Sequence, residues 1–470
     1  MRTRSCPESL LPAGEGQDEG RPCAVLPSPQ PSPAGRGREA QRHTPFGGVI
    51  SLLAFCKPRF LILAWLLPAL AAAQPAGEPL TWEESVRQAA AVNPDLRVAR
   101  DSLRAAEMDV RGAGSGFLPK LTGSVAKTDT SDTTTTTPDY SAALTASQNL
   151  FAGFRDQASV AQARANRAVA EANLRSARAR LSFDLKSAFA ALRSADDALV
   201  LSADILRRRE QNLRLVELRY ESGRENKGSL YLSQATLSQA RFESLQAGQA
   251  LRVAQAQFAR VLGRDNPQTI RLAGEVPIIA PPAQVDFAQA VQATPDQQRA
   301  LAQVEAAKAG VDIASSTFWP SLDLSGTASR SGDDWVPDER RNSVSLSLTV
   351  PIFSGGKDYY GVRSAGARES AAEATREGLI RQLRAQLEQA YAGYAQAVAK
   401  LDVDEAFLKA ATARSEIARS KYSNGLMSFE DWDIIENDLI NRQKAVLQSR
   451  RDRVTAEAAW EQALGNGAIP

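Results

Sequence analysis

Two long stretches of the chain carry apolar residues at helical spacing. Residues 139–266 and 352–469 contain no proline and are rich in Ala, Leu, Arg, Gln and Glu, which are good helix formers. Leucines recur at steps of four or seven along the first stretch, at positions 174, 181, 185, 192, 199, 206 and 213. Such a narrow apolar stripe on an otherwise polar helix predicts packing like that of a coiled coil.

The predicted helices are unusually long. A helix from Phe151 to Glu221 would measure roughly 106 Å if it were continuous. We expect it to turn at Gly223–Gly228 and to return to about Leu262. The second stretch has the same plan, with its turn at Asn424–Gly425. The pattern therefore predicts two long helical hairpins.

Four shorter segments alternate with a period of two residues, which is typical of strands. Their apolar positions are Leu121 and Val125; Tyr140, Ala142, Leu144 and Ala146; Leu322, Leu324 and Ala328; and Val344, Leu346, Leu348, Val350 and Ile352. Mostly Ser, Thr and Asp stand between them, and the loops at 127–139 and 329–342 are polar. The alternation suits a barrel with lipid on one side and water on the other. A half-buried sheet of a water-soluble protein would give the same pattern.

Five short landmarks occur twice, 201 or 202 residues apart. They are Asn93-Pro94-Asp95 and Thr294-Pro295-Asp296; Phe117-Leu118-Pro119 and Phe318-Trp319-Pro320; Leu150-Phe151-Ala152-Gly153 and Ile352-Phe353-Ser354-Gly355; Tyr220 to Gly223 and Tyr422 to Gly425; and Leu262-Gly263 and Leu464-Gly465. A constant offset over this length indicates a tandem duplication. Each copy has a short helix (about 82–113 and 284–315), a Phe-x-Pro corner, two strands and a long helical hairpin. We assign 74–263 to the first repeat, 264–283 to a linker, 284–466 to the second repeat and 467–470 to a short tail.

The first 73 residues differ from the rest. Residues 1–48 are rich in Pro, Gly and Arg, a composition typical of a disordered extension, or the product of a start site assigned too early. Residues 49–73 have a basic Lys57-Pro58-Arg59 followed by an apolar run and Ala71-Ala72-Ala73. This is the pattern of a secretory signal peptide cut after Ala73. A membrane anchor is the alternative, although the run is short for a span.

Composition limits the chemistry of residues 74–470. All three cysteines (Cys6, Cys23, Cys56) and the only histidine (His43) lie in the first 73 residues. Thiol nucleophiles, histidine bases and most zinc sites are therefore excluded from the remainder. Its net charge is −1, which gives no reason to expect a nucleic-acid partner. We predict no cofactor, no metal and no enzymatic activity.

The predicted strands require more than one chain if they lie in a membrane. After residue 73 no stretch of 18 apolar residues occurs, so a spanning helix is not expected. Only a closed barrel would then satisfy the backbone in lipid, and four strands are too few to close one. We therefore expect an oligomer. The alternative is a periplasmic coiled-coil adaptor or structural protein without a pore.

The ordered and duplicated set of motifs, over about residues 80–466, resembles the TolC-type outer-membrane efflux proteins. The resemblance implies a homotrimer, with a 12-stranded β-barrel in the lipid of the outer membrane and a long helical barrel across the periplasm. It also implies a periplasmic adaptor and an inner-membrane pump as partners, in drug efflux, metal efflux or protein secretion. The sequence does not choose among these cargoes.

The same resemblance assigns roles to the two helical turns. The turns at Gly223 and Gly425 would be the periplasmic tips that contact the adaptor. Glu225 and Lys227 lie on the first tip and could set the choice of partner, or could simply be solvated surface residues. Tyr422 and Asp431 align with family residues that help to close the channel there. Other closing residues are missing, because the matching positions hold Ile434, Met427 and Ser229.

Each of these residues also has a simpler structural interpretation. Ser428-Phe429-Glu430-Asp431 is a capping box, so Asp431 could cap a helix, line the pore or do both. Tyr220 and Tyr422 could be packing aromatics. The corner residues Phe117, Pro119, Phe318, Trp319 and Pro320 could anchor at the lipid–water interface or fill the corner. Trp335, in a charged loop, has no assigned role.

Overall fold

The computed structural model describes residues 79–131, 136–265 and 270–470. The predicted N-terminal extension (1–48) and signal peptide (49–73) lie outside the described residues. So do parts of the first hairpin loop and of the linker, at 132–135 and 266–269.

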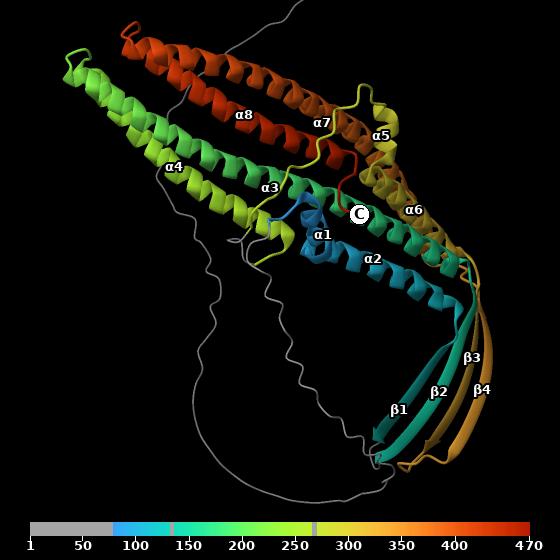
Figure 1. Cartoon of the computed structure of the whole chain (residues 1–470). Coiled ribbons are helices and arrows are strands. Elements are labelled where there is room, and N and C mark those ends of the chain that lie inside the picture. The colour runs from blue at the N-terminus through green and yellow to red at the C-terminus, as the bar shows by residue number, and fades with distance from the viewer. Residues whose placement is uncertain (1–78, 132–135, 266–269) are drawn as a thin grey trace, which may run out of the picture. The chain divides into compact units, whose positions relative to one another are not determined.

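The described elements form two similar series (Figure 1). The first series contains α1 (Trp82–Val92), α2 (Pro94–Ala113), a 3-10 turn η1 (Gly114–Phe117), β1 (Lys120–Ser131), β2 (Thr136–Ala152), α3 (Arg155–Glu221) and α4 (Lys227–Leu262). The second contains α5 (Phe287–Ala293), α6 (Pro295–Ser315), η2 (Ser316–Phe318), β3 (Ser321–Gly332), β4 (Glu339–Thr349), α7 (Lys357–Ser423) and α8 (Phe429–Ala463). The predicted fold class, mainly helical with long antiparallel hairpins and four strands, is confirmed.

The short helix predicted at the start of each repeat is wrong, because the structure has two helices there. Asn93 has φ −57° and ψ 126°, the extended region that a following proline imposes. Its side chain accepts hydrogen bonds from the N–H groups of Asp95 and Leu96 and so caps α2. It also donates to the carbonyl of Val261 at the end of α4, 3.0 Å away. Thr294 makes the equivalent break before α6.

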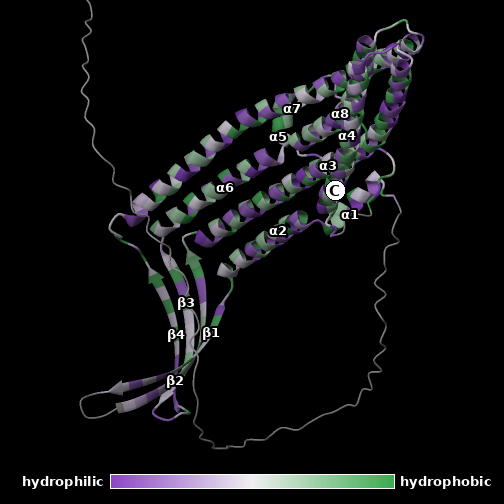
Figure 2. Ribbon diagram, turned by 90° about the vertical axis from the view of Figure 1, so that its left-hand side faces the viewer, coloured by the Kyte–Doolittle hydropathy of each residue, from purple (hydrophilic) through white to green (hydrophobic). Residues whose placement is uncertain are grey.

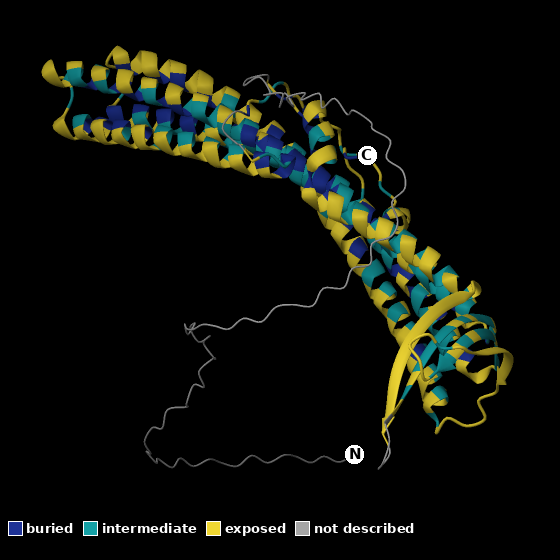
Figure 3. Ribbon diagram, turned by 90° about the horizontal axis from the view of Figure 1, so that it is seen from below, coloured by how far each residue is buried: buried dark blue, intermediate teal, exposed yellow. Residues whose placement is uncertain are grey.

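The long helices α3 and α7 each have 67 residues, or roughly 100 Å. The expected start of the first at Phe151 is wrong, because β2 continues to Ala152. Gly153 and Phe154 then turn the chain with φ of 61° and 67°. The hairpins α3–α4 and α7–α8 lie side by side, with α3 against α8 (Figure 1). Buried positions lie between the helices (Figure 3).

The leucine stripe is buried only in its first half. Leu174, Leu181, Leu185 and Leu192 are buried, whereas the three later leucines are half-buried. Nearer the turn, α3 buries polar as well as apolar residues, among them Arg209 and Asn212. Apolar and polar positions interleave along every long helix (Figure 2). No helix in the described ranges is long and apolar enough to cross a membrane.

The strands form one antiparallel sheet in the order β1-β2-β3-β4. They are longer than expected at the hairpin ends, since β1 reaches Ser131 and β3 reaches Gly332. One face carries the apolar positions, of which Val125 and Val344 are both 83% exposed. The other carries hydroxyl side chains, and Thr145 and Thr327 hydrogen-bond across it at 3.1 Å. The expected continuation of the last strand through Ile352 is wrong, because β4 ends at Thr349.

The largest apolar core lies where α1, α3 and α4 meet the segment after residue 270. Phe189 is its centre, with edge contacts to Trp82 at 5.6 Å and to Phe258 at 5.9 Å between ring centroids. Leu80 adds a bridge to Leu272. This core holds the start of the first repeat against the long hairpin.

Candidate functional site

Both helical turns end in the same backbone motif. Gly223 and Gly425 have φ of 72° and 76°, a left-handed conformation that glycine adopts without a steric penalty. In each turn the glycine N–H donates to the carbonyl three residues back, and the next N–H donates to the carbonyl five residues back. These bonds satisfy the last carbonyl groups of α3 and α7. The predicted turn glycines are therefore where the sequence placed them.

The two turns are joined by a compact set of side chains, here called the tip cluster: Arg219, Glu225, Tyr422 and Trp432. Tyr422 is 0% exposed. Its ring stacks on Trp432 with centroids 4.3 Å apart and an interplanar angle of 10°. The Arg219 guanidinium lies over the same ring, 4.6 Å from its centroid. Tyr422 is thus held between a cation and an indole.

Polar contacts tie this cluster across the two repeats. The Tyr422 hydroxyl donates to Glu225 Oε2 at 2.9 Å, and Arg219 Nη1 donates to the Tyr422 carbonyl at 2.8 Å. Arg219 Nε lies 3.8 Å from Glu225 Oε2. Burial raises the pKa of Tyr422, and the hydrogen bond to Glu225 raises it further. The phenol therefore remains a neutral donor throughout the physiological pH range.

Asp431 lies in the first turn of helix α8, whose N-cap is Ser428. Its backbone N–H donates to Ser428 Oγ at 3.1 Å, and its carboxylate accepts from the same hydroxyl at 2.8 Å. The side chain is exposed, so capping leaves the carboxylate accessible to water and ions. The capping interpretation is thus realised, and a pore-lining role remains a prediction.

The acidic neighbours of Asp431 face the interior of the chain. Asp433 accepts from buried Arg209 at 3.1 Å, and Glu436 is 2% exposed and bonded to Ser415. Ile434, at the position where the resembling family has its second acidic residue, is exposed. Neither carboxylate is therefore free to replace the missing acidic residue.

The remaining tip residues divide into buried and exposed groups. Ser229 is buried, and its N–H donates to the Asn226 side chain at 2.9 Å as part of a helix cap. Lys227 is exposed, with Nζ 5.3 Å from the ring centroid of Tyr231. Tyr220 is partly exposed, and Leu426, at the end of the second turn, is 76% exposed. Lys227 and Leu426 are therefore among the exposed side chains of the two turns.

Sequence reasoning missed Arg219, Trp432 and the pairing of Glu225 with Tyr422. Glu225 and Tyr422 lie 197 positions apart. A single sequence carries no signal that brings such distant side chains together. The aromatic pair of Tyr422 and Trp432 across a predicted hairpin turn was the one local indication.

Charged side chains also form pairs between the long helices, farther from the turns. Lys186 on α3 lies 2.8 Å from Glu457 and 3.0 Å from Glu461 on α8, and Lys186 and Glu457 are buried. Asp404 on α7 accepts from Lys400 at 2.7 Å and from Ser449 on α8. The bonds from Lys400 and then Ser449 lower the pKa of Asp404. The helices of one chain are thus fixed to each other by charged contacts.

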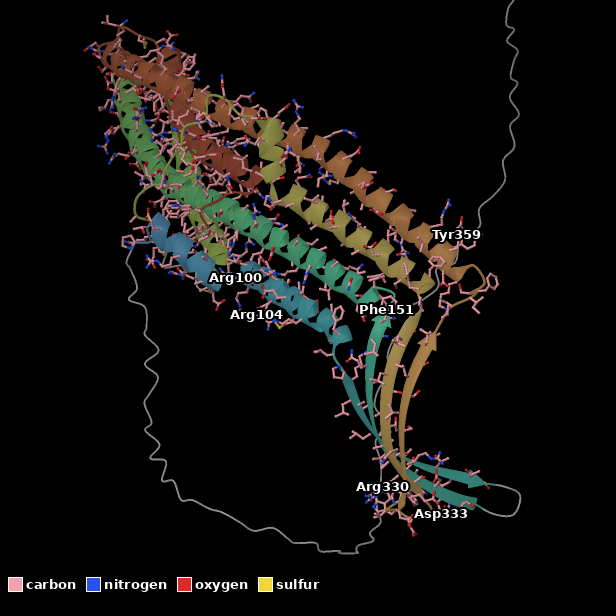
Figure 4. The ribbon with its side chains drawn as sticks, turned by 90° about the vertical axis from the view of Figure 1, so that its right-hand side faces the viewer. Arg100, Arg104, Phe151, Arg330, Asp333 and Tyr359 are labelled. Atoms are coloured by element: carbon pink, nitrogen blue, oxygen red, sulfur yellow. The ribbon has the colours of Figure 1, made fainter. Side chains whose placement is uncertain are left out.

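The corners before β1 and β3 combine packing with exposure. Phe154 makes edge contacts with Phe151 at 5.2 Å and with Trp319 at 5.7 Å, and Figure 4 shows Phe151 where β2 meets α3. A side chain at Gly153 would lie 2.5 Å from the Ser316 carbonyl, so only glycine fits. Trp319, Phe318 and Phe117 are about half exposed. Pro119 and Pro320 directly precede the strands. Trp319 therefore fills its corner and still presents a free surface.

Three comparisons place these features among known proteins. The family model described as "Outer membrane efflux protein" matches residues 85–264 and 287–466. The outer membrane efflux protein BepC of Brucella suis is 22% identical over 382 residues, covering 79% of this chain and 82% of that protein.

Two solved structures share the fold. The crystal structure of CusC superposes with a TM-score of 0.73 at 21% identity, covering 82% of this chain and 91% of that chain. The CmeC outer membrane channel of Campylobacter jejuni gives 0.73 at 17% identity, covering 82% and 85%. Among the residues that the structure describes, no group of three or more His, Cys, Asp or Glu could hold a metal.

Proposed function

The chain belongs to the outer membrane efflux protein family, and we propose that three copies of it form the conduit of a tripartite export system. Its role as an export channel of the outer membrane, predicted from the sequence, is confirmed by this membership. The homotrimer, the adaptor and pump partners, and the gate residues are our proposals. The conduit is passive, with no catalytic step, and the pump sets the cargo.

The trimer is proposed because the sheet has one apolar and one polar face and two open edges. In the described sheet β1 and β4 each have one neighbour, so one edge of each lacks backbone partners. In lipid those groups must be paired. Three copies joined edge to edge give twelve strands and leave no edge. No observation favours the alternative, a periplasmic adaptor without a pore.

The internal duplication supplies a template for the joint between copies. Within one chain β2 of the first repeat pairs with β3 of the second. The equivalent pairing between chains joins β4 to β1 of the next copy. Within one chain, Ala146 on β2 lies opposite Gly326 on β3. The residue of β4 that corresponds to Ala146 is 202 positions later, Leu348, and the residue of β1 that corresponds to Gly326 is 201 positions earlier, Val125. Leu348 would therefore lie opposite Val125 of the neighbouring copy. Both are exposed and apolar.

The helical tips are the proposed gate and docking end. The tip cluster holds the α7–α8 turn against the α3–α4 turn, so separating the turns must break its contacts. In a trimer three Asp431 carboxylates near one axis would attract cations and repel one another. Lys227 and Leu426, both exposed, together with the turns at Gly223 and Gly425, are proposed to meet the periplasmic adaptor.

Cysteine cross-linking tests the assembly. Residues 74–470 contain no cysteine, so Val125→Cys with Leu348→Cys would introduce a single disulfide type. Directly opposed strand residues lie within the distance that a disulfide needs. We expect covalent trimers after mild oxidation of outer membranes. Val125→Cys with Val344→Cys, four residues out of register, is the matched control and should stay monomeric. Monomers from both pairs would reject the ring.

A further inference from the structure

Two arginines face each other near the hairpin end of the sheet. Arg330 on β3 and Arg340 on β4 are directly opposed in the strand register, and both are exposed. Figure 4 shows Arg330 at this end of the strands, close to Asp333. Like charges in directly opposed positions destabilise a sheet. A negative charge between the two guanidinium groups would relieve this repulsion.

The sheet itself does not provide that charge. In the described part of the chain no carboxylate forms an ion pair with Arg330 or Arg340. On the first strand of the sheet, Asp129 is 3.0 Å from Lys127 and so is already paired. Asp333 and Asp334 are exposed in the adjacent turn, and neither lies within ion-pair distance. Asp338 and Glu339, which directly precede Arg340 and are exposed, lie outside ion-pair distance as well. Neither guanidinium group therefore has a carboxylate partner among the described residues.

Both arginines lie on the apolar face of the sheet. Alternate residues share a face, so Arg330 follows Leu324 and Ala328, and Arg340 precedes Val344 and Leu346. The adjacent Arg341 lies on the opposite, hydroxyl-bearing face. A cation on the apolar face contacts the lipid headgroups, whereas Arg341 faces the water-filled side.

An open groove of about 490 Å³ runs across this face to the arginine pair. Its lining combines apolar side chains with the two arginines on the β3–β4 side and with polar Ser124, Ser329 and Asn342; the apolar members include Val125, Ala142, Leu144 and Ala328. Small side chains at Ala142 and Ala328 leave the depression, and the larger Val125 and Leu144 border it. A hydrocarbon chain next to an anionic group matches that arrangement.

Aromatic residues mark the level of the headgroups. Tyr140 and Trp335 make an edge contact with centroids 5.7 Å apart, and Trp335 is 77% exposed. Lys127 Nζ lies 5.8 Å from the Tyr140 ring centroid. Aromatic and basic residues gather at membrane–water interfaces. This assigns Trp335 a role and places the arginine pair at the depth of lipid phosphates.

We propose that Arg330 and Arg340 bind the phosphate of an outer-leaflet glycolipid, with an acyl chain lying along the groove. The proposal rests on the membrane placement given under Proposed function, in which the hairpin ends face outward. Two guanidinium groups recognise a phosphate by bidentate hydrogen bonds. Asp333 and Asp334 can accept hydrogen bonds from sugar hydroxyls, which favours a glycolipid over a phospholipid.

The test is native mass spectrometry of the detergent-purified full chain titrated with diphosphorylated lipid A. The double variant Arg330→Gln/Arg340→Gln should bind at least tenfold more weakly than wild type. Arg341→Gln, the matched control on the opposite face, should bind as wild type. Phosphatidylglycerol and inorganic phosphate should compete poorly.

Four results would overturn the proposal: no binding to wild type, equal binding by the double variant, an equal loss in Arg341→Gln, or equal affinity for phosphatidylglycerol or free phosphate. Bilayer conductance is measured on the same preparations. Wild type that binds lipid A without conducting would count against the channel and not against the lipid site. The double variant should conduct as wild type does.

Discussion

Tyr422→Phe removes a single hydroxyl from the tip cluster and leaves the stacked ring in place. The lost hydrogen bond runs to a carboxylate at 2.9 Å, and such bonds contribute roughly 1.5–3 kcal/mol. Glu225 is half-buried and keeps Arg219 nearby, so its remaining charge is partly compensated. We therefore use the lower end of the range, about 1.5 kcal/mol.

If opening separates the two turns, this bond exists only in the closed state. Its loss then shifts the equilibrium toward the open state by about tenfold, since 1.4 kcal/mol corresponds to a factor of ten. Single-channel recording in planar bilayers measures the open fraction directly. The shift should be the same at pH 7 and at pH 9, because the raised pKa of Tyr422 keeps the phenol protonated.

Tyr394→Phe is the matched control. Tyr394 is another buried tyrosine, whose hydroxyl donates to the carbonyl of Ile279 away from the tips. Burial raises its pKa to about 12, so it too is a neutral donor. This variant should lower the unfolding midpoint and leave the open fraction unchanged. An unchanged open fraction in Tyr422→Phe, with a similar loss of stability, would refute the assignment of Tyr422 to the gate.

Three further predictions concern buried and exposed charges. Lys186→Met should lower the free energy of unfolding by about 3–5 kcal/mol, because it leaves the Glu457 carboxylate buried and unpaired. Adding Glu457→Leu should restore most of this loss, as measured by urea unfolding followed by circular dichroism. A double variant as unstable as the single variant would contradict this. Asp404 has a lowered pKa, so its carboxylate stabilises the fold at pH values above the unfolded pKa of about 3.8. The difference in unfolding free energy between wild type and Asp404→Asn should be constant near neutral pH and shrink as the pH falls below about 4. A difference that persists at pH 2 would show that the charge of Asp404 does not cause the stabilisation. Asp431→Ala should weaken block of the channel by multivalent cations, measured as the blocking concentration, and unchanged block would reject the acidic ring.

Local signals predicted the elements of this fold well. The absence of proline and the heptad leucines gave the long helices, and the glycine turns lie where expected. The break at Asn93–Pro94 was missed although its signal was present, because an Asn followed by Pro both ends one helix and caps the next. Phe151 was placed in a helix, since its motif gives no sign that the strand continues into it.

The contacts of the candidate site could not be predicted in the same way. Arg209 lies 224 positions from Asp433 in the sequence, and only the packing of α3 on α8 brings them together. Asp433 directly precedes Ile434 in the sequence, and its carboxylate is bonded to Arg209 inside the chain. For Asp431 the sequence left open a capping role, a pore-lining role or both, and the structure shows its contacts with the N-cap residue Ser428.

The central claim is that the chain forms a pore, and planar-bilayer conductance of purified residues 74–470 tests it most directly. A pore should give discrete, stable conductance steps that favour cations over anions. The opposite result is a protein that circular dichroism shows to be folded and helical but that gives no conductance steps at any concentration. That result would reject the pore and favour a periplasmic role without one.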